Sequence, residues 1–192
     1  MAEPFVSAYL DGLRGVLNEI HEDAVARVID VLWEAYRAGS RIFIIGNGGS
    51  AATASHMMCD LAKGCAAEGR PLVKAMSLTD NVSLLTAVGN DIAYERVFTE
   101  QLRVFLEPRD VVVAITASGN SPNILDAVRY AGERGARTVG LIGFGGGQLK
   151  ALVDADITVS SRNYGHVEDV HCVLEHLISQ CLRERITAGA AE

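Results

Sequence analysis

The feature that most constrains the fold is a series of five short apolar segments, separated by stretches with helical periodicity. Their apolar residues are consecutive rather than alternating, which is typical of strands that are covered on both faces. Such strands alternating with helices predict an α/β fold with a doubly wound, five-stranded parallel sheet flanked by helices. The expected strands are Arg41–Ile45, Leu72–Ser77, Asp110–Ile115, Thr138–Ile142 and Ala155–Val159.

Helical periodicity fills most of the remaining chain. Two amphipathic stretches within residues 1–39 predict an N-terminal helical hairpin, which ends at Ala38-Gly39. The 192 residues contain no repeat or linker, so one domain spanning 1–192 is expected. The other expected helices are Ser50–Lys63, Asn81–Val88, Ala93–Arg103, Ile124–Arg134, a short helix from Gln148, and Val167–Arg185.

Composition makes several classes of protein unexpected. With 49% hydrophobic residues the chain can bury a core, and its net charge of -7 without a Lys/Arg cluster disfavours nucleic-acid binding. No apolar stretch is long enough to span a bilayer, so no membrane partner is expected. The N-terminal segment predicts an amphipathic helix rather than a signal peptide, and the 4 cysteines form no CxxC pair. We therefore expect free thiols in a reducing cytoplasm.

Ligands of doubly wound sheets bind beyond the carboxyl ends of the strands, which directs attention to the loops that follow them. The first such loop, GNGGS (Gly46–Ser50), leaves a strand and opens a helix. Its glycines permit close backbone approach, and the Ser50 hydroxyl and the first helical amides suit a phosphate. The alternative interpretation is a tight turn in which Ser50 is only the helix N-cap.

The loop TASGNS (Thr116–Ser121) repeats this arrangement after another strand, with hydroxyls on Thr116, Ser118 and Ser121. Pro122 follows at a position that suits the first turn of a helix. Two hydroxyl-rich helix starts in one sheet favour a phosphate site more than one does. Neither loop has the GxxxxGK[ST] pattern, which disfavours nucleotide triphosphate hydrolysis. A third loop, GFGGGQ, has no hydroxyl and is interpreted as a structural turn.

His56 and Asp60 are four residues apart on the helix after the first loop and therefore share a face. Such a pair is commonly a surface pair or a core histidine, but at an anion site it suits metal ligation or general base catalysis. Cys59 is expected to be a buried apolar residue because it ends the run Met57-Met58-Cys59.

The last helix carries a second group of polar residues. Glu168, Cys172 and His176 fall near one face, while Glu175 is expected on a different face. Glu168 and His176 are two turns apart, about 12 Å along the axis. They can meet at one atom only if Glu168 lies at the helix start and reaches inward. By itself, this pattern indicates a polar helix face.

Taken together, GNGGSAATASH, VGND (Val88–Asp91), TASGNSPN and the histidine-bearing last helix resemble the sugar isomerase domain family over nearly the whole chain. The resemblance implies a five-stranded parallel sheet and a homotetramer with sites at subunit interfaces, in which residues 1–39 serve oligomerisation. It implies aldose–ketose isomerisation through an enediolate. Within the family, the nearest resemblance is to enzymes that convert sedoheptulose 7-phosphate to D-glycero-heptopyranose 7-phosphate.

The resemblance also implies roles for individual residues. A phosphate would bind Ser50, Thr116, Ser118 and Ser121, and the sugar would lie against Asn47 and Asp91, beside the loop residues Gly48, Gly49 and Ala117. Asp60, Glu168 and His176 would transfer protons. Zn2+, bound in several members, would be held by His56, Asp60, Glu168 and His176. Two departures stand out, since Asp60 occupies a position that is usually Glu and Glu168 one that is usually Gln.

Three other functions agree with parts of this pattern. A non-catalytic relative that binds the replication initiator is disfavoured by the presence of His56, Asp60 and His176. A sugar-phosphate sensor is disfavoured, because such domains usually lie beside a DNA-binding domain, for which we expect no room in these residues. An isomerase of a pentose or hexose phosphate stays open, because loop details set the sugar. Four further residues are interpreted as solvated surface rather than as parts of a neighbouring subunit's site: Lys63, Arg70, Tyr94 and Arg96.

Overall fold

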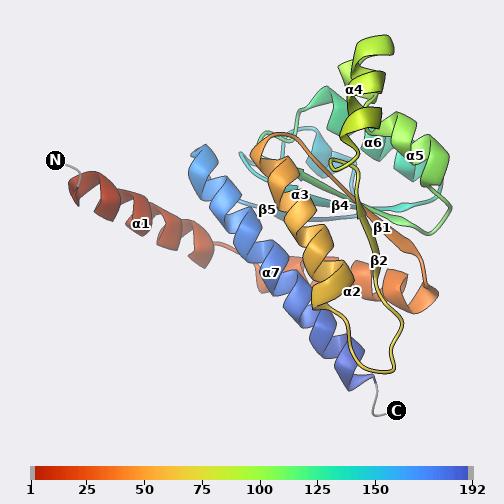
Figure 1. The fold of residues 1–192 in the computed structure, drawn as a ribbon. Helices are drawn as coiled ribbons and strands as arrows, with labels where there is room; N and C mark the ends of the chain where they lie inside the picture. Colours follow the sequence, from red (N-terminus) through yellow and green to blue (C-terminus); the bar gives the residue numbers. More distant parts are fainter. Residues whose placement is uncertain (1–2, 190–192) are drawn as a thin grey trace.

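The computed structural model describes residues 3–189 and contains one parallel five-stranded sheet with the order β2-β1-β3-β4-β5 (Figure 1). The expected doubly wound α/β fold is therefore confirmed. Of the predicted domain, residues 1–2 and 190–192 lie outside the described part of the chain. The strands are β1 (Arg41–Gly46), β2 (Lys74–Ser77), β3 (Val111–Thr116), β4 (Arg137–Ile142) and β5 (Ala155–Thr158).

Helices cover both faces of this sheet, as the continuous apolar strands require. In β1, Ile42 and Ile44 pack under α2, α3 and α7, whereas Phe43 and Ile45 pack under α4, α5 and α6. Two cores thus lie on either side of the sheet. The helices are α2 (Glu22–Ala38), α3 (Gly49–Cys59), α4 (Val82–Asp91), α5 (Thr99–Phe105), α6 (Pro122–Glu133) and α7 (Tyr164–Ala188).

The first helix, α1 (Glu3–Asn18), projects from the body of the molecule instead of folding back on α2 as a hairpin (Figure 1). It packs on the beginning of α7, where the Tyr9 hydroxyl donates to Asp169 (2.7 Å) and the Tyr9 ring lies against His166. Its apolar residues Phe5 and Val6 remain exposed. None of the described helices combines the length and apolar character needed to cross a membrane.

Three helical segments differ from the sequence prediction. The helix expected over Ala93–Arg103 is divided into a 3-10 turn at Tyr94–Arg96 and α5, and Ala93 is extended rather than helical. The one expected from Gln148 is only a 3-10 turn, Leu149–Ala151. The helix expected over Ser50–Lys63 is α-helical only as far as Cys59 and continues as a π-helical turn, Asp60–Gly64. Such turns are frequent at functional sites.

Candidate functional site

A cavity of about 160 Å³ lies where β1 and β3, neighbours in the sheet, reach their carboxyl ends. It is therefore in the place where doubly wound sheets bind ligands. The beginnings of α3 and α6 point their free amides toward this region, which favours an anion. The cavity is lined by Asn47, Ser50, Ile115, Thr116, Ala117, Ser118, Ser121, Tyr164 and Glu168.

The first predicted loop turns sharply into α3. Gly48 has a φ of 57°, in the region that glycine tolerates best, and it is the N-cap of α3 without a side-chain cap. The alternative interpretation of Ser50 as the N-cap is therefore wrong. Within the described chain the Ser50 hydroxyl has no hydrogen-bond partner, although the residue is buried at the cavity. This hydroxyl is available to a ligand.

The second loop holds its own hydroxyls in place. The Gly119 N–H donates to Thr116 Oγ1 (3.3 Å), and the Asn120 N–H donates to Ser118 Oγ (3.2 Å). Ser121 is the N-cap of α6, but its side chain makes no capping hydrogen bond. Two of these oxygens thus keep acceptor capacity toward the cavity, and the Ser121 hydroxyl is not used by the helix.

The third loop supports the second, as predicted for a structural turn. A Cβ on Gly119 would lie 2.2 Å from the carbonyl oxygen of Gly146, so the two backbones meet at a distance that only glycine permits. The Gln148 N–H donates to Asn120 Oδ1 (3.1 Å), and the Leu149 N–H donates to the Gly119 carbonyl (3.0 Å). The shape of the hydroxyl-bearing loop therefore depends on GFGGG.

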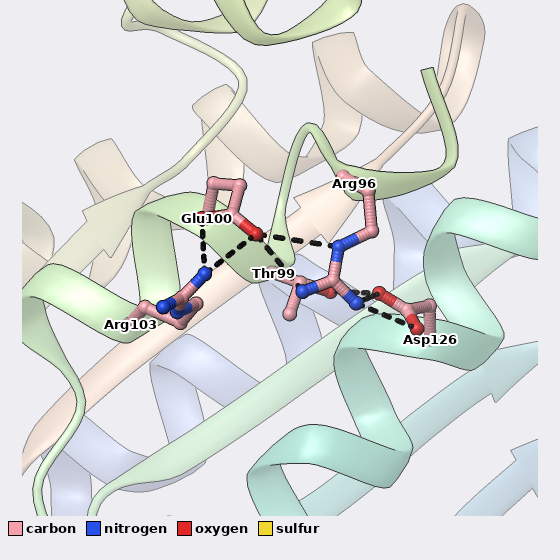
Figure 2. A network of polar contacts seen from close by, with 5 residues as sticks. All are labelled: Arg96, Thr99, Glu100, Arg103 and Asp126. Carbon is pink, nitrogen blue, oxygen red and sulfur yellow. Dashed lines mark hydrogen bonds and ion pairs between the residues drawn. The ribbon is translucent and has the colours of Figure 1, made fainter. Parts of the chain in front are cut away.

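Asn47 is fixed by two partners on the α4–α6 side of the sheet. Its amide and that of Asn123 exchange two hydrogen bonds of 2.9 Å, and the Tyr94 hydroxyl donates to Asn47 Oδ1 (3.0 Å). Tyr94 therefore contacts the site of its own chain. The sequence prediction of solvated surface misses this contact, since the tyrosine is far from Asn47 in sequence. Arg96, by contrast, belongs to a separate ion-pair network (Figure 2).

A second group of functional side chains lies along the line of contact between α3 and α7, which run side by side (Figure 1). We call this line the α3–α7 seam. The Thr53 hydroxyl and the Cys172 thiol meet across it (3.6 Å). Further along are His56, Asp60, Glu175 and His176, whose ligand atoms all lie within 4.8 Å of one another. We call these four residues the seam cluster.

Within the seam cluster, one carboxylate is buried and the other residues are partly accessible. Glu175 has no exposed side-chain surface, and its Oε1 lies 3.1 Å from His56 Nδ1 and 3.4 Å from His176 Nε2. Asp60 Oδ2 lies 3.8 Å from His176 Nε2. Burial raises the pKa of Glu175 above its ordinary value, while the two histidines act in the opposite direction and Asp60 adds to the increase.

The structure thus brings together three of the four residues expected to hold a metal, namely His56, Asp60 and His176. Glu168 is not among them, because it lies two turns earlier on α7. Its carboxylate is at the cavity, where a Cβ on Gly49 would come within 2.5 Å of it. The second carboxylate of the cluster is Glu175.

Two other expected positions differ from the prediction. Asp91 is exposed at the end of α4, where it accepts a hydrogen bond from Asn90 (2.8 Å), and it does not line the cavity of its own chain. Cys59 is exposed rather than buried, because each helical residue turns by about 100°: Met57 is buried in the core and Met58 packs partly against it, whereas Cys59 faces outward.

Sequence reasoning missed Glu175, although the sequence contains a signal for it. The buried stripe of α7 includes Val167, His171 and Leu174, and position 175 continues the same spacing. A carboxylate on the buried stripe of a helix needs a partner. That pattern distinguishes Glu175 from the exposed acids of the same helix.

A cavity beyond the strand ends and a cluster of histidines and acids, on a doubly wound sheet, place the chain among the α/β proteins that bind ligands at the carboxyl edge of the sheet. The chain belongs to the SIS domain family, whose model matches residues 8–143. It is 37% identical to the phosphoheptose isomerase of Geobacter sp. (strain M21), over 92% of this chain and 90% of that protein.

Solved structures give the same result. The phosphoheptose isomerase from Neisseria gonorrhoeae superimposes with a TM-score of 0.89 at 28% identity, covering 96% of this chain and 100% of that one. The phosphoheptose isomerase from Francisella tularensis gives a TM-score of 0.87 at 25% identity, covering 96% of this chain and 99% of that one. The family resemblance expected from the motifs is therefore confirmed.

Proposed function

We propose that this protein is an aldose–ketose isomerase of phosphorylated sugars, which converts sedoheptulose 7-phosphate to D-glycero-heptopyranose 7-phosphate. One observation carries the proposal: the helices α3 and α7 supply both Ser50 and Glu168 of the cavity and, further along, the histidines and acids of the seam cluster. The names of its relatives support the seven-carbon substrate.

The cavity would bind the phosphate group. Ser50, Thr116, Ser118 and Ser121 provide hydroxyls there, beside the amide ends of α3 and α6. The described lining of the cavity contains no lysine or arginine, so the positive potential that attracts the phosphate would come from the N-termini of α3 and α6. Binding energy from this remote phosphate would hold the reacting carbons in place, with the fixed amide of Asn47 orienting the sugar.

The reaction requires a base that removes the proton beside the carbonyl and returns it to the neighbouring carbon of the enediolate. Three groups are candidates: Glu168 at the cavity, and Asp60 and His176, whose carboxylate and imidazole are 3.8 Å apart. His56 follows Gly49 by two turns of α3, or about 10 Å. An extended sugar phosphate bound at the helix start and lying along α3 would reach the seam cluster with its carbonyl end.

The residues present also fit a zinc ion. Imidazole nitrogens and carboxylate oxygens are ordinary zinc ligands, and the buried oxygens of Glu175 lack hydrogen-bond partners. His56, Asp60 and His176 would hold the ion together with one further carboxylate. When bound, zinc supplies Lewis-acid polarisation of the sugar's carbonyl and enediolate oxygens.

Assembly and location are further parts of the proposal. A homotetramer is supported by the exposed apolar residues of α1 and by an apolar groove of about 600 Å³ between α2 and α7. The mass in solution, measured by light scattering, tests it, and a monomer contradicts it. The four cysteines are free, which supports a reducing, cytoplasmic location.

The activity is tested by proton NMR in heavy water. The protein, loaded with zinc, is incubated with sedoheptulose 7-phosphate, with and without a chelator. We expect an aldose phosphate that carries deuterium beside the carbonyl, and we expect it to disappear on chelation. Exchange only with a pentose or hexose phosphate would change the substrate. No exchange with any of them would refute the isomerase and favour a phosphosugar-binding or partner-binding protein.

A further inference from the structure

Glu175 is an anomaly in the described chain. Its side chain is fully buried on α7, and neither carboxylate oxygen has a hydrogen-bond partner. Buried carboxylates in proteins are normally paired or hydrogen-bonded, because an unsatisfied one loses its hydration without compensation. Among the described residues, no N–H or O–H group donates a hydrogen bond to either oxygen of this carboxylate.

The surroundings of Glu175 indicate what its partner is. Its Oε1 faces the ring nitrogens of His56 at 3.1 Å and of His176 at 3.4 Å, yet neither contact has hydrogen-bond geometry. The two imidazoles lie edge to face, with ring centroids 4.8 Å apart. Nitrogen and oxygen atoms thus converge on a common point without donating to one another, which is how the ligands of a cation are arranged.

The spacing of these atoms also suits zinc. Bonds of 2.0–2.1 Å in a tetrahedron place neighbouring ligand atoms about 3.3 Å apart. The distances from Glu175 Oε1 to the two imidazole nitrogens are 3.1 and 3.4 Å, and Asp60 Oδ2 is 3.8 Å from His176 Nε2. Two histidines and two carboxylates complete a four-ligand set in which Asp60 begins the π-helical turn after α3.

We propose that Glu175, rather than Glu168, is the second carboxylate ligand of a zinc site formed with His56, Asp60 and His176. Glu168 then remains free at the cavity, where its carboxylate meets the bound sugar phosphate. The role of Glu168 at the cavity rests on the proposed isomerase function, whereas the assignment of Glu175 as a zinc ligand depends only on metal binding. The proposal also gives a role at the cavity to the carboxylate of Glu168, which occupies a position where the family resemblance implies Gln.

The test compares two identical chemical changes on the same helix. Glu175→Gln and Glu168→Gln are made in the full chain, stripped of metal, and titrated with zinc by calorimetry in competition with a chelator. Loss of groups that only orient metal ligands costs about 10–100-fold in affinity, so we expect Glu175→Gln to weaken zinc binding at least tenfold. Glu168→Gln, which removes a carboxylate from the cavity and not from the seam cluster, should leave zinc affinity within about threefold.

Two further measurements keep the outcome decisive. Circular dichroism and melting show whether Glu175→Gln folds, and the absorption spectrum of bound Co²⁺ reports a changed ligand set even where affinity changes little. Zinc binding lost with Glu168→Gln but kept with Glu175→Gln overturns the proposal, as does a wild-type chain that binds no zinc. A wild-type chain that binds zinc through Glu175 but exchanges no sugar proton supports the ligand assignment and refutes only the isomerase.

Discussion

The seam cluster and the network around Arg96 are both groups of charged side chains, yet they differ in whether each carboxylate has a hydrogen-bonded cation beside it. In the Arg96 network, on the α5–α6 side of the sheet, each carboxylate meets a guanidinium (Figure 2). Arg96 pairs with Glu100 (2.9 Å) and Asp126 (3.0 Å), and Arg103 pairs with Glu100 from the other side (2.9 Å). Thr99 donates its hydroxyl to Asp126.

The pKa directions express the same contrast. Hydrogen bonds from Arg96 and Arg103 lower the pKa of Glu100, whereas burial raises the pKa of Glu175. A carboxylate whose charge is neutralised by its neighbours stabilises the fold. A buried one without hydrogen bonds destabilises it and persists where function requires it. The comparison therefore separates a structural cluster from a functional one by hydrogen bonding rather than by composition.

The largest expected difference between the two clusters is in catalysis. His176→Gln should lower kcat about a hundredfold or more, because it removes either a proton-transfer group of the proposed reaction or a ligand of the proposed zinc site. Arg103→Gln, in the Arg96 network, should leave kcat within about twofold. Both are measured by deuterium exchange into the sugar phosphate at saturating substrate. Equal losses in the two variants would show that the seam cluster has no special part in the reaction.

His171, a buried histidine on α7, extends the comparison to the stability of the fold. His171 is fully buried, and burial lowers its pKa from 6.5 to about 4. Between these values the unfolded chain takes up a proton that the folded chain excludes. Each pH unit in this window costs about 1.4 kcal/mol, so about 3 kcal/mol of stability should disappear as pH falls from 6.5 to 4.

Denaturant unfolding at several pH values checks this loss. The titrating group is removed in His171→Leu, so the variant should lose correspondingly less stability over the same window. The difference between the two slopes isolates His171 from every other group that titrates there. Parallel slopes would mean that His171 takes up its proton in the folded protein as well.

The sequence predicted the sheet well because its information is local. Continuous apolar runs such as Val111–Ile115 require two covered faces, and the two hydroxyl-rich loops follow strands that are neighbours in the sheet. The pairing of His56 with Asp60 followed from helical spacing alone. These inferences depend only on residues close together in the chain.

The rest depended on packing between distant segments. Whether Glu168 or Glu175 meets His56 is decided by how α7 is placed along α3, and no periodicity within either helix contains that offset. Tyr94, in the 3-10 turn that replaces the start of the expected helix, donates to Asn47, which is distant from it in sequence. Asp91 is at the surface of its own chain, so its expected contact with the sugar stays a prediction about the assembled protein.

A smaller effect tests the cost of the unsatisfied carboxylate itself. Without metal, Glu175→Gln should raise the free energy of unfolding at pH 7 by about 1–2 kcal/mol, because a buried acceptor without a donor costs about 1–3 kcal/mol and more when charged. Since the folded pKa of Glu175 is raised, the gain should shrink as pH falls through that pKa toward the ordinary value. With saturating zinc, the wild type should become the more stable of the two proteins.

Thermal melting of stripped and zinc-loaded samples measures this reversal. Glu133→Gln is the control, an exposed carboxylate on α6 that makes no ion pair or side-chain hydrogen bond within the described chain. Its stability should be the same as that of the wild type with and without zinc. A stripped Glu175→Gln protein less stable than the wild type would show that the histidines already compensate the buried charge, which would make the seam cluster an ordinary ion-pair network.

The smallest effect belongs to the Arg96 network. The Arg103 side chain is 57% exposed, and its partner Glu100 remains paired with Arg96 when Arg103 is removed. Arg103→Ala should therefore cost less than about 1 kcal/mol, and high salt should reduce that cost further. Arg96→Ala should cost more, because Asp126 and Glu100 lose their shared cation together. Urea unfolding at low and high salt compares the two, and a larger, salt-independent loss for Arg103→Ala would contradict the view that this network is stabilised by redundant surface pairing.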